Sequence, residues 1–238
     1  LGIRVGVDVS WFVVLFLFIF VLSGSFKDAL DGSDGEAYLT AVASALLFFG
    51  SLVLHELGHA LVARRLGIGI SGIDLWFFGG IAKMTGDTES PGDEFKVAVA
   101  GPVVTALIIG ACVGLGIAAT GSWAEFWDVA TLDASVQVTP ATLLVSWLAT
   151  INLLLLVFNL VPAFPLDGGR IARAIAWRLT GDRSRATRFA AGLGQAFAYI
   201  LIGLGIFELV QGSLGGGLWL IVLGMFLGQA ARGAVSQT

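Results

Sequence analysis

The sequence AVASALLFFGSLVLHELGHALVARRL, residues 41–66, is a long apolar run interrupted by a short polar motif. A helix needs about 20 mostly apolar residues to cross the hydrocarbon core of a bilayer. The run therefore predicts a transmembrane helix, which we place at Tyr38–Leu66. The interruption is HELGH, which contains His55, Glu56 and His59, and these two histidines are the only ones in the chain.

The spacing inside HELGH favours a metal site. Residues four apart on a helix share a face, with about 5–6 Å between their Cβ atoms, so the imidazoles of His55 and His59 suit one metal ion. Glu56 lies off that face and would act on a bound water as a general base, as in H-E-x-x-H metalloproteases. The alternative is a set of polar side chains hydrogen-bonded between helices. Because ionisable residues inside a membrane are costly and usually functional, we favour metal binding.

The composition extends the membrane assignment to the whole chain. Of the 238 residues, 57% are apolar and 13% are charged, whereas soluble domains carry roughly 25% charged residues. We therefore expect an all-α integral membrane protein in which residues 1–238 form a single polytopic membrane domain. Six segments are apolar enough and long enough to span the bilayer: Val9–Phe26, Tyr38–Leu66, Phe95–Thr120, Ala141–Val161, Phe189–Val210 and Gly217–Ala231.

Two further segments are not predicted to span. Ile68–Met84 is apolar, rich in glycine and partly alternating, which predicts a small re-entrant β-hairpin after the second span. Such backbone is tolerated at membrane depth only where protein or a cavity satisfies its polar groups. Gly169–Thr180 predicts a short interfacial helix whose arginine side chains extend to water.

The basic residues predict the orientation of the chain. Six spans place both termini on one side, and cytoplasmic loops carry an excess of Lys and Arg. Of the 13 basic residues, only Lys27 falls on the opposite side. We therefore expect a multi-pass protein of the cell (inner) membrane, with cytoplasmic termini and an active site toward the cytoplasm. The net charge is −4 without a basic stripe, so nucleic acid is not an expected partner.

The histidine pair needs a third protein ligand, because a catalytic zinc site usually combines three protein ligands with water. The fourth span runs in the same direction as the second and is followed by VPAFPLDGG, residues 161–169. This topology brings Asp167 to the membrane face that carries the histidines. The alternative is that Asp167 caps the following helix. Four other carboxylates are less suitably placed: Asp8, Asp74, Asp182 and Glu208.

Two amides of the fourth span are candidates for binding the substrate. Asn159 lies at the inner end of this span, and its side chain would hold the substrate backbone or the developing oxyanion. A hydrogen bond between helices is an equal alternative for Asn159. It is the favoured one for Asn152, two turns earlier on the same helix face. The candidate catalytic residues are thus Glu56 and Asn159.

Together the two motifs resemble the site-2 protease family of intramembrane zinc metalloproteases. HELGH (55–59) matches the family's H-E-x-x-H motif. NLVPAFPLDGG (159–169) matches its second motif, in which an asparagine and two prolines precede Asp-Gly. FFGG (77–80) and AGP (100–102) also resemble bacterial members.

The resemblance implies one zinc ion held by His55, His59 and Asp167, with Glu56 activating water. It also implies that the 68–84 hairpin presents an edge strand to an unwound substrate. The implied substrates are transmembrane proteins such as an anti-sigma factor or a membrane-held transcription factor, cut within or near their membrane segments; an oligomer is compatible with this. Some relatives carry two CBS domains after the last span, so we expect the end at Thr238 to be a truncation of such a member.

Two other functions fit part of the pattern. A zinc transporter or sensor would use the same ligands, but a transport site needs no general base such as Glu56, and the sequence shows no internal repeat. A membrane metalloprotease of another family would use a glutamate as third ligand and soluble or peripheral substrates. The PLDGG context of Asp167 argues against that family.

Overall fold

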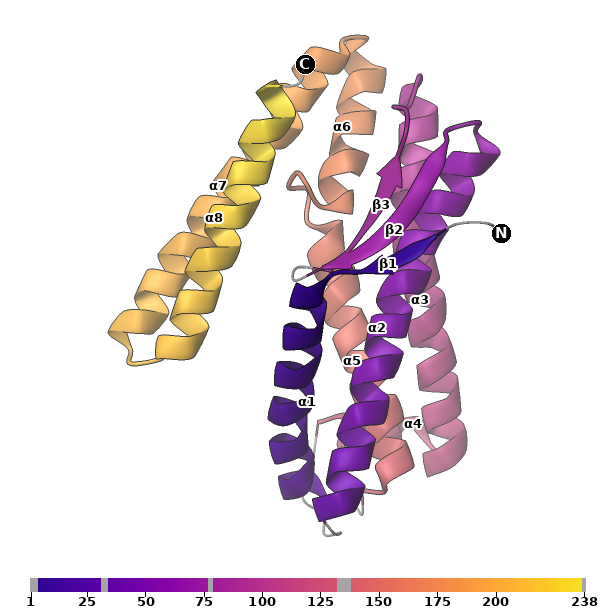
Figure 1. The fold of residues 1–238 in the computed structure, drawn as a ribbon, viewed down its shortest axis with the longest axis vertical. Helices are drawn as coiled ribbons and strands as arrows, with labels where there is room; N and C mark the ends of the chain where they lie inside the picture. Colours follow the sequence, from indigo (N-terminus) through magenta and orange to yellow (C-terminus); the bar gives the residue numbers. More distant parts are fainter. Residues whose placement is uncertain (1–3, 31–33, 77–78, 132–137, 237–238) are drawn as a thin grey trace. The chain divides into compact units, whose positions relative to one another are not determined.

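The computed structural model describes residues 4–30, 34–76, 79–131 and 138–236. Within these ranges the chain forms eight helices and three strands (Figure 1). In chain order they are β1 (Val5–Val7), α1 (Val9–Ala29), α2 (Asp34–Arg65), β2 (Ile70–Trp76), β3 (Gly79–Met84), α3 (Pro91–Thr120), α4 (Trp123–Ala130), α5 (Pro140–Leu160), α6 (Asp167–Thr180), α7 (Arg183–Val210) and α8 (Leu214–Ser236).

Six of these helices are long and apolar enough to cross a membrane: α1, α2, α3, α5, α7 and α8. Each overlaps one predicted span, so the all-α fold class and the six spans are confirmed. Large apolar side chains remain exposed along all six helices, as lipid-facing surfaces require. The chain is therefore a multi-pass membrane protein.

Short-range polar signals set helix boundaries that hydropathy alone did not predict. Helix α3 begins at Pro91, four residues before the predicted start, because the side chain of Ser90 caps its first turn. The Ser90 Oγ accepts from the Asp93 N–H at 3.1 Å and donates to its carboxylate at 2.8 Å. Helix α4 was not predicted; the side chain of Ser122 caps it by accepting from the Glu125 N–H at 3.2 Å.

The chain divides into two compact units. The first contains Leu1–Asp87 and Ala100–Leu156, and the second contains Thr88–Val99 and Val157–Thr238. In the first unit α1 packs against α2. The contacting positions recur every three to four residues, with large side chains on α1 and mainly alanine on α2, which lets the two helices approach closely. They are Leu15, Ile19, Leu22 and Phe26 on α1, and Ala37, Ala41, Ala45 and Phe49 on α2.

A small sheet lies against α2 in the same unit (Figure 1). β2 and β3 pair antiparallel, which confirms the predicted hairpin, and β1 pairs parallel to β2, with Val5 opposite Ile73. The strand β1 was not predicted, because three residues are too few to indicate a strand by themselves. Phe77 and Phe78, half of the FFGG motif, lie outside the described residues.

In the second unit α7 and α8 form a helical hairpin, and α6 packs on α7. Glycines bring the backbones of α7 and α8 together. A Cβ on Gly205 would lie 2.6 Å from the carbonyl oxygen of Gly217, and one on Gly224 would lie 2.7 Å from that of Ala198. The helix predicted at Gly169–Thr180 is confirmed as α6, which begins two residues earlier.

Candidate metal centre

The HELGH motif lies in the C-terminal third of α2, where both histidine side chains turn into the protein. His55 is 3% exposed and His59 is 2% exposed. Their Nε2 atoms are 3.2 Å apart. Two nitrogens bound to a tetrahedral zinc ion at roughly 2.0–2.1 Å lie about 3.3 Å from each other. The separation of the Nε2 atoms therefore fits two ligands of one ion.

The other ring nitrogen of His55 is held by α3. Its Nδ1 lies 2.8 Å from the Oγ1 of Thr105, and both side chains are buried. A proton on Nδ1 would be donated to the threonine hydroxyl, which leaves the Nε2 lone pair available to a metal. Metal-binding histidines usually make such a bond through their second nitrogen, and it sets the orientation of the ring.

Gly101, one turn before Thr105 on α3, keeps space open beside both rings. A Cβ on Gly101 would lie 2.3 Å from the Nε2 of His59 and 2.6 Å from the Nε2 of His55. These distances are close to a zinc–nitrogen bond of roughly 2.0–2.1 Å, so any larger residue would occupy the space that an ion needs. Gly58 likewise lets α2 approach α3, since a Cβ there would lie 2.9 Å from the carbonyl oxygen of Ala100.

Asp167 is the first residue of α6 and is 8% exposed. The sequence left open that Asp167 caps this helix, but the capping position is occupied by Leu166. A carboxylate in the first turn interacts favourably with the positive end of the helix dipole. The buried carboxylate thus lies one residue inside the helix and not at its capping position.

Two glycines after Asp167 allow the chain between α5 and α6 to fold back tightly on itself. A Cβ on Gly168 would lie 2.3 Å from the carbonyl oxygens of Leu160 and Val161. One on Gly169 would lie 2.3 Å from the backbone nitrogen of Phe164. Neither position accepts a side chain without moving backbone, so the PLDGG sequence gives Asp167 a closely packed setting.

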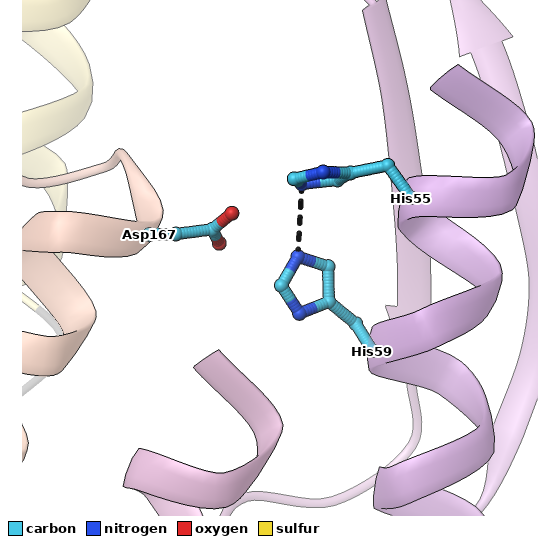
Figure 2. A group of neighbouring side chains, drawn as sticks. All are labelled: His55, His59 and Asp167. Atoms are coloured by element: carbon cyan, nitrogen blue, oxygen red, sulfur yellow. Dashed lines mark hydrogen bonds between the residues drawn. The ribbon is translucent and has the colours of Figure 1, made fainter. Parts of the chain in front are cut away.

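The structure groups three of the residues that the sequence predicted as ligands. Figure 2 shows their side chains, with His55 and His59 on α2 and Asp167 at the start of α6. One ligand atom from each residue lies within 4.8 Å of the others, and all three residues are buried. Two imidazoles and one carboxylate suit zinc, and three protein ligands leave a fourth position for water or substrate. The donor set therefore fits a catalytic zinc site.

The other candidate residues lie on the helices predicted for them. Glu56 is half-buried on α2, next to His55, and Asn159 is half-buried near the end of α5. Asn152 is fully buried, and its Nδ2 donates to the carbonyl oxygen of Leu148 at 2.9 Å. This bond stays within α5, so it does not show the predicted link between helices. The roles of Glu56 and Asn159 stay predictions.

Among the described residues, none of the four alternative carboxylates joins the group of ligands. Asp8 and Asp182 instead cap helices. The N–H of Ser10 donates to Asp8, and the N–H of Arg185 donates to Asp182. Hydrogen bonds from Ser10 lower the pKa of Asp8, and the bond from the Arg185 backbone lowers the pKa of Asp182, as expected for charged caps. Asp74 and Glu208 lie half-buried in β2 and α7.

Two residues of this site were not predicted from the sequence. Thr105 has no distinguishing feature among the many small residues of α3. Gly101 was noted only as part of the AGP motif, and the Gly-Pro pair inside an apolar span is the one signal that marked it. Both act through packing against α2, which the sequence does not show.

Comparison with known proteins points to one family. The sequence profile of Peptidase family M50 matches residues 43–204, more than half of the chain. The chain is 40% identical over 234 residues to the Mycobacterium tuberculosis protein named "Putative zinc metalloprotease Rip3", covering 97% of this chain and 56% of that protein. It is 33% identical over 204 residues to "Zinc metalloprotease MJ0392" of Methanocaldococcus jannaschii, covering 86% of this chain and 52% of that protein. The chain thus spans little more than half the length of these relatives.

A solved structure shares the fold. The site-2 protease from Methanocaldococcus jannaschii is 28% identical in sequence, with a TM-score of 0.64, and the match covers 99% of this chain and 92% of that chain. The matched profile includes both HELGH and the segment 159–169 that carries Asp167. The chain belongs to peptidase family M50, the family of site-2 proteases.

Proposed function

We propose that this chain is an intramembrane zinc metalloendopeptidase, which hydrolyses peptide bonds within or near the transmembrane segments of membrane-anchored proteins. The observation that carries the proposal is the group formed by His55, His59 and Asp167 in a chain with six apolar helices. Membership of family M50 supports the same function, and so do the names of the two relatives, each of which contains the words zinc metalloprotease.

The proposed ligands are the Nε2 atoms of His55 and His59 and a carboxylate oxygen of Asp167, with one zinc ion per chain. When bound, zinc would polarise the scissile carbonyl and lower the pKa of water toward neutrality. Thr105 would hold the His55 ring in the orientation that presents Nε2. Gly101 would leave the space beside the rings free.

Glu56 is the proposed general base. It follows His55 directly, so its side chain leaves α2 about 100° around the helix from that histidine. Its carboxylate would accept a proton from the attacking water and then deliver it to the amine that leaves, as the peptide bond breaks. Proton transfer by such a side chain contributes roughly 10²–10⁴-fold to a rate.

Asn159 is the proposed substrate-binding amide. Its Nδ2 would donate a hydrogen bond to a backbone carbonyl of the substrate. It would favour the transition state most if that oxygen is the one on which negative charge develops.

The sheet suggests how a membrane segment would be presented to the site. A helical substrate hides its carbonyls in hydrogen bonds, so it must unwind before it can be cut. β3 is at one edge of the sheet and contacts α2, the helix that carries HELGH. An unwound segment would pair with β3 as an added strand. Suitable substrates are membrane-anchored proteins, for example an anti-sigma factor or a membrane-held transcription factor.

We also propose an orientation for the protein. Because 12 of the 13 Lys and Arg residues fall on the side of the termini, both termini would lie in the cytoplasm and the protein in the cell (inner) membrane. The active site would then open toward the cytoplasmic side, which supplies water. Residues 1–238 would work as one membrane domain.

The test uses the purified protein reconstituted in liposomes with a transmembrane peptide labelled on both sides of its apolar segment. Zinc-loaded protein should cut the peptide, chelation should stop the cutting, and added zinc should restore it. Glu56→Gln should keep one zinc per chain and cut nothing. If instead the protein binds zinc, leaves the peptide intact and moves zinc across the liposome membrane, the transporter function would replace this proposal.

A further inference from the structure

A buried ion pair in the second unit is not explained by the proposed chemistry. Glu94, in the first turn of α3, is fully buried, and the side chain of Arg173 on α6 is 13% exposed. The Nε of Arg173 donates to the Oε1 of Glu94 at 2.7 Å, and its Nη2 donates to the same oxygen. The pair therefore joins α3 to α6 through two residues that are 79 positions apart in the sequence.

Stability alone is a poor explanation for this pair. Removing two charges from water is costly, and attraction repays the cost only where every remaining polar atom is also bonded. The Oε2 of Glu94 is buried and has no hydrogen-bond partner among the described residues. Apolar residues of similar volume often stabilise such a position as well as an ion pair does. Apolar contacts, however, do not fix the orientation of a side chain. The hydrogen bonds to a carboxylate oxygen do, because they define where the guanidinium lies.

The guanidinium of Arg173 also contacts the loop that leads into Asp167. Its central carbon lies 5.4 Å from the centre of the Phe164 ring, a distance at which a cation is attracted to an aromatic face. Phe164 precedes Asp167 by three residues and Arg173 follows it by six. The contact thus connects the chain before Asp167 with the helix after it.

Phe164 is itself closely packed against α7. Its N–H donates to the carbonyl oxygen of Ala190 at 3.4 Å. A Cβ on Gly194 would lie 2.2 Å from the carbonyl oxygen of Phe164, so only glycine fits there. The loop is therefore held by α7 on one side and by Arg173 on the other, and Glu94 holds Arg173.

From these contacts we propose that Glu94 and Arg173 are positioning residues for Asp167: the ion pair sets the direction in which α6 presents the carboxylate to the metal. This inference rests on the proposed role of Asp167 as a zinc ligand. Neither residue is proposed to touch zinc, water or substrate.

The experiment compares zinc affinity with thermal stability in the purified full chain. Glu94→Gln removes the charge and leaves Arg173 without a counter-ion, so both zinc affinity and melting temperature should fall. Glu94→Met/Arg173→Met removes both charges, so the melting temperature should return to that of the wild type. Zinc affinity, measured by competition with a chelator, should stay about 10–100-fold weaker in both variants, the range found when groups that orient ligands are removed. Lys96→Met, which removes an exposed pair with Asp93, should change neither quantity.

Cobalt in place of zinc gives a second readout that does not depend on activity. The visible absorption of bound cobalt reports the arrangement of its ligands, so the doubly substituted protein should differ from the wild type and Lys96→Met should not. If the doubly substituted protein binds zinc as tightly as the wild type with the same cobalt spectrum, the positioning role is refuted and the proposed protease is untouched. If the wild type binds no zinc, both proposals fail together.

Discussion

A Cβ atom on Gly101 would lie 2.3 Å from the Nε2 of His59. At this position α3 contributes open space to the candidate metal centre, because glycine has no side chain. The same helix supplies a side chain one turn later, where Thr105 bonds to His55. One face of α3 thus both leaves space beside the two Nε2 atoms and bonds to one of the proposed ligands.

Gly101→Ala should abolish metal binding while the helix remains intact, because alanine is a better helix former than glycine. The added methyl group would take the space between the two Nε2 atoms. Zinc per chain, measured by elemental analysis, should fall from one to near zero with unchanged circular dichroism. Gly110→Ala is the matched control, since no atom lies within 4 Å of a Cβ there. A Gly101→Ala protein with a full zinc complement would show that the ion does not lie in this space.

Thr105→Val should weaken zinc binding about 10–100-fold, because the ring of His55 loses the hydrogen bond that orients it. Thr105→Ser, which keeps the hydroxyl, should bind zinc close to wild-type affinity. Chelator competition gives both values. Thr120→Val, whose hydroxyl bonds to the carbonyl oxygen of Gly116 in the same helix, controls for loss of a threonine hydroxyl. Equal affinities for Thr105→Val and the wild type would show that the bond from the Nδ1 of His55 to Thr105 does not prepare Nε2 for the metal.

Glu56→Gln should abolish peptide cleavage and leave zinc binding unchanged. The amide keeps the size of the side chain but accepts no proton, so a loss on the order of 10²–10⁴-fold in cleavage rate is expected. The measurement is cleavage of a transmembrane peptide together with zinc per chain. Full activity in this variant would refute the assignment of Glu56 as the base.

Asp167→Ala should lower the amount of bound zinc, because two histidines remain where a catalytic site needs three protein ligands. Elemental analysis after dialysis provides the measurement. Asp128→Ala, on α4, removes a half-buried aspartate outside the proposed site and should keep the metal. An unchanged stoichiometry in Asp167→Ala would place the third ligand elsewhere.

Gly224→Leu should destabilise the second unit by about 1–3 kcal/mol, since an inserted side chain forces closely packed helices apart. A Cβ at this position would lie 2.7 Å from the carbonyl oxygen of Ala198. Gly203→Leu, at a position with open space around it, should have little effect. The measurement is the melting temperature of each variant in the same detergent. Equal values for the two variants would contradict the packing of α7 on α8.

The elements that were predicted and those that were missed differ in the kind of signal they carry. The six spans are continuous apolar stretches, so a count of residues was enough to find them. Helix α4 has eight residues and is too short for such a count. The strand β1 is defined only by its pairing with β2. The early start of α3 depends on the capping side chain of Ser90, and it is this extra turn that brings Glu94 into a helix.

The sequence by itself determined that the chain lies in a membrane and that His55, His59 and Asp167 are the candidate ligands. Composition, helical spacing and the direction of successive spans are properties of the chain read in order, and they need no knowledge of packing. Only the tertiary structure decided that Thr105 orients His55 and that Gly101 must lack a side chain. It alone also showed that Glu94 pairs with Arg173. These relationships join residues 42 to 79 positions apart, and they depend on how side chains of all sizes let the helices approach, which no local pattern encodes.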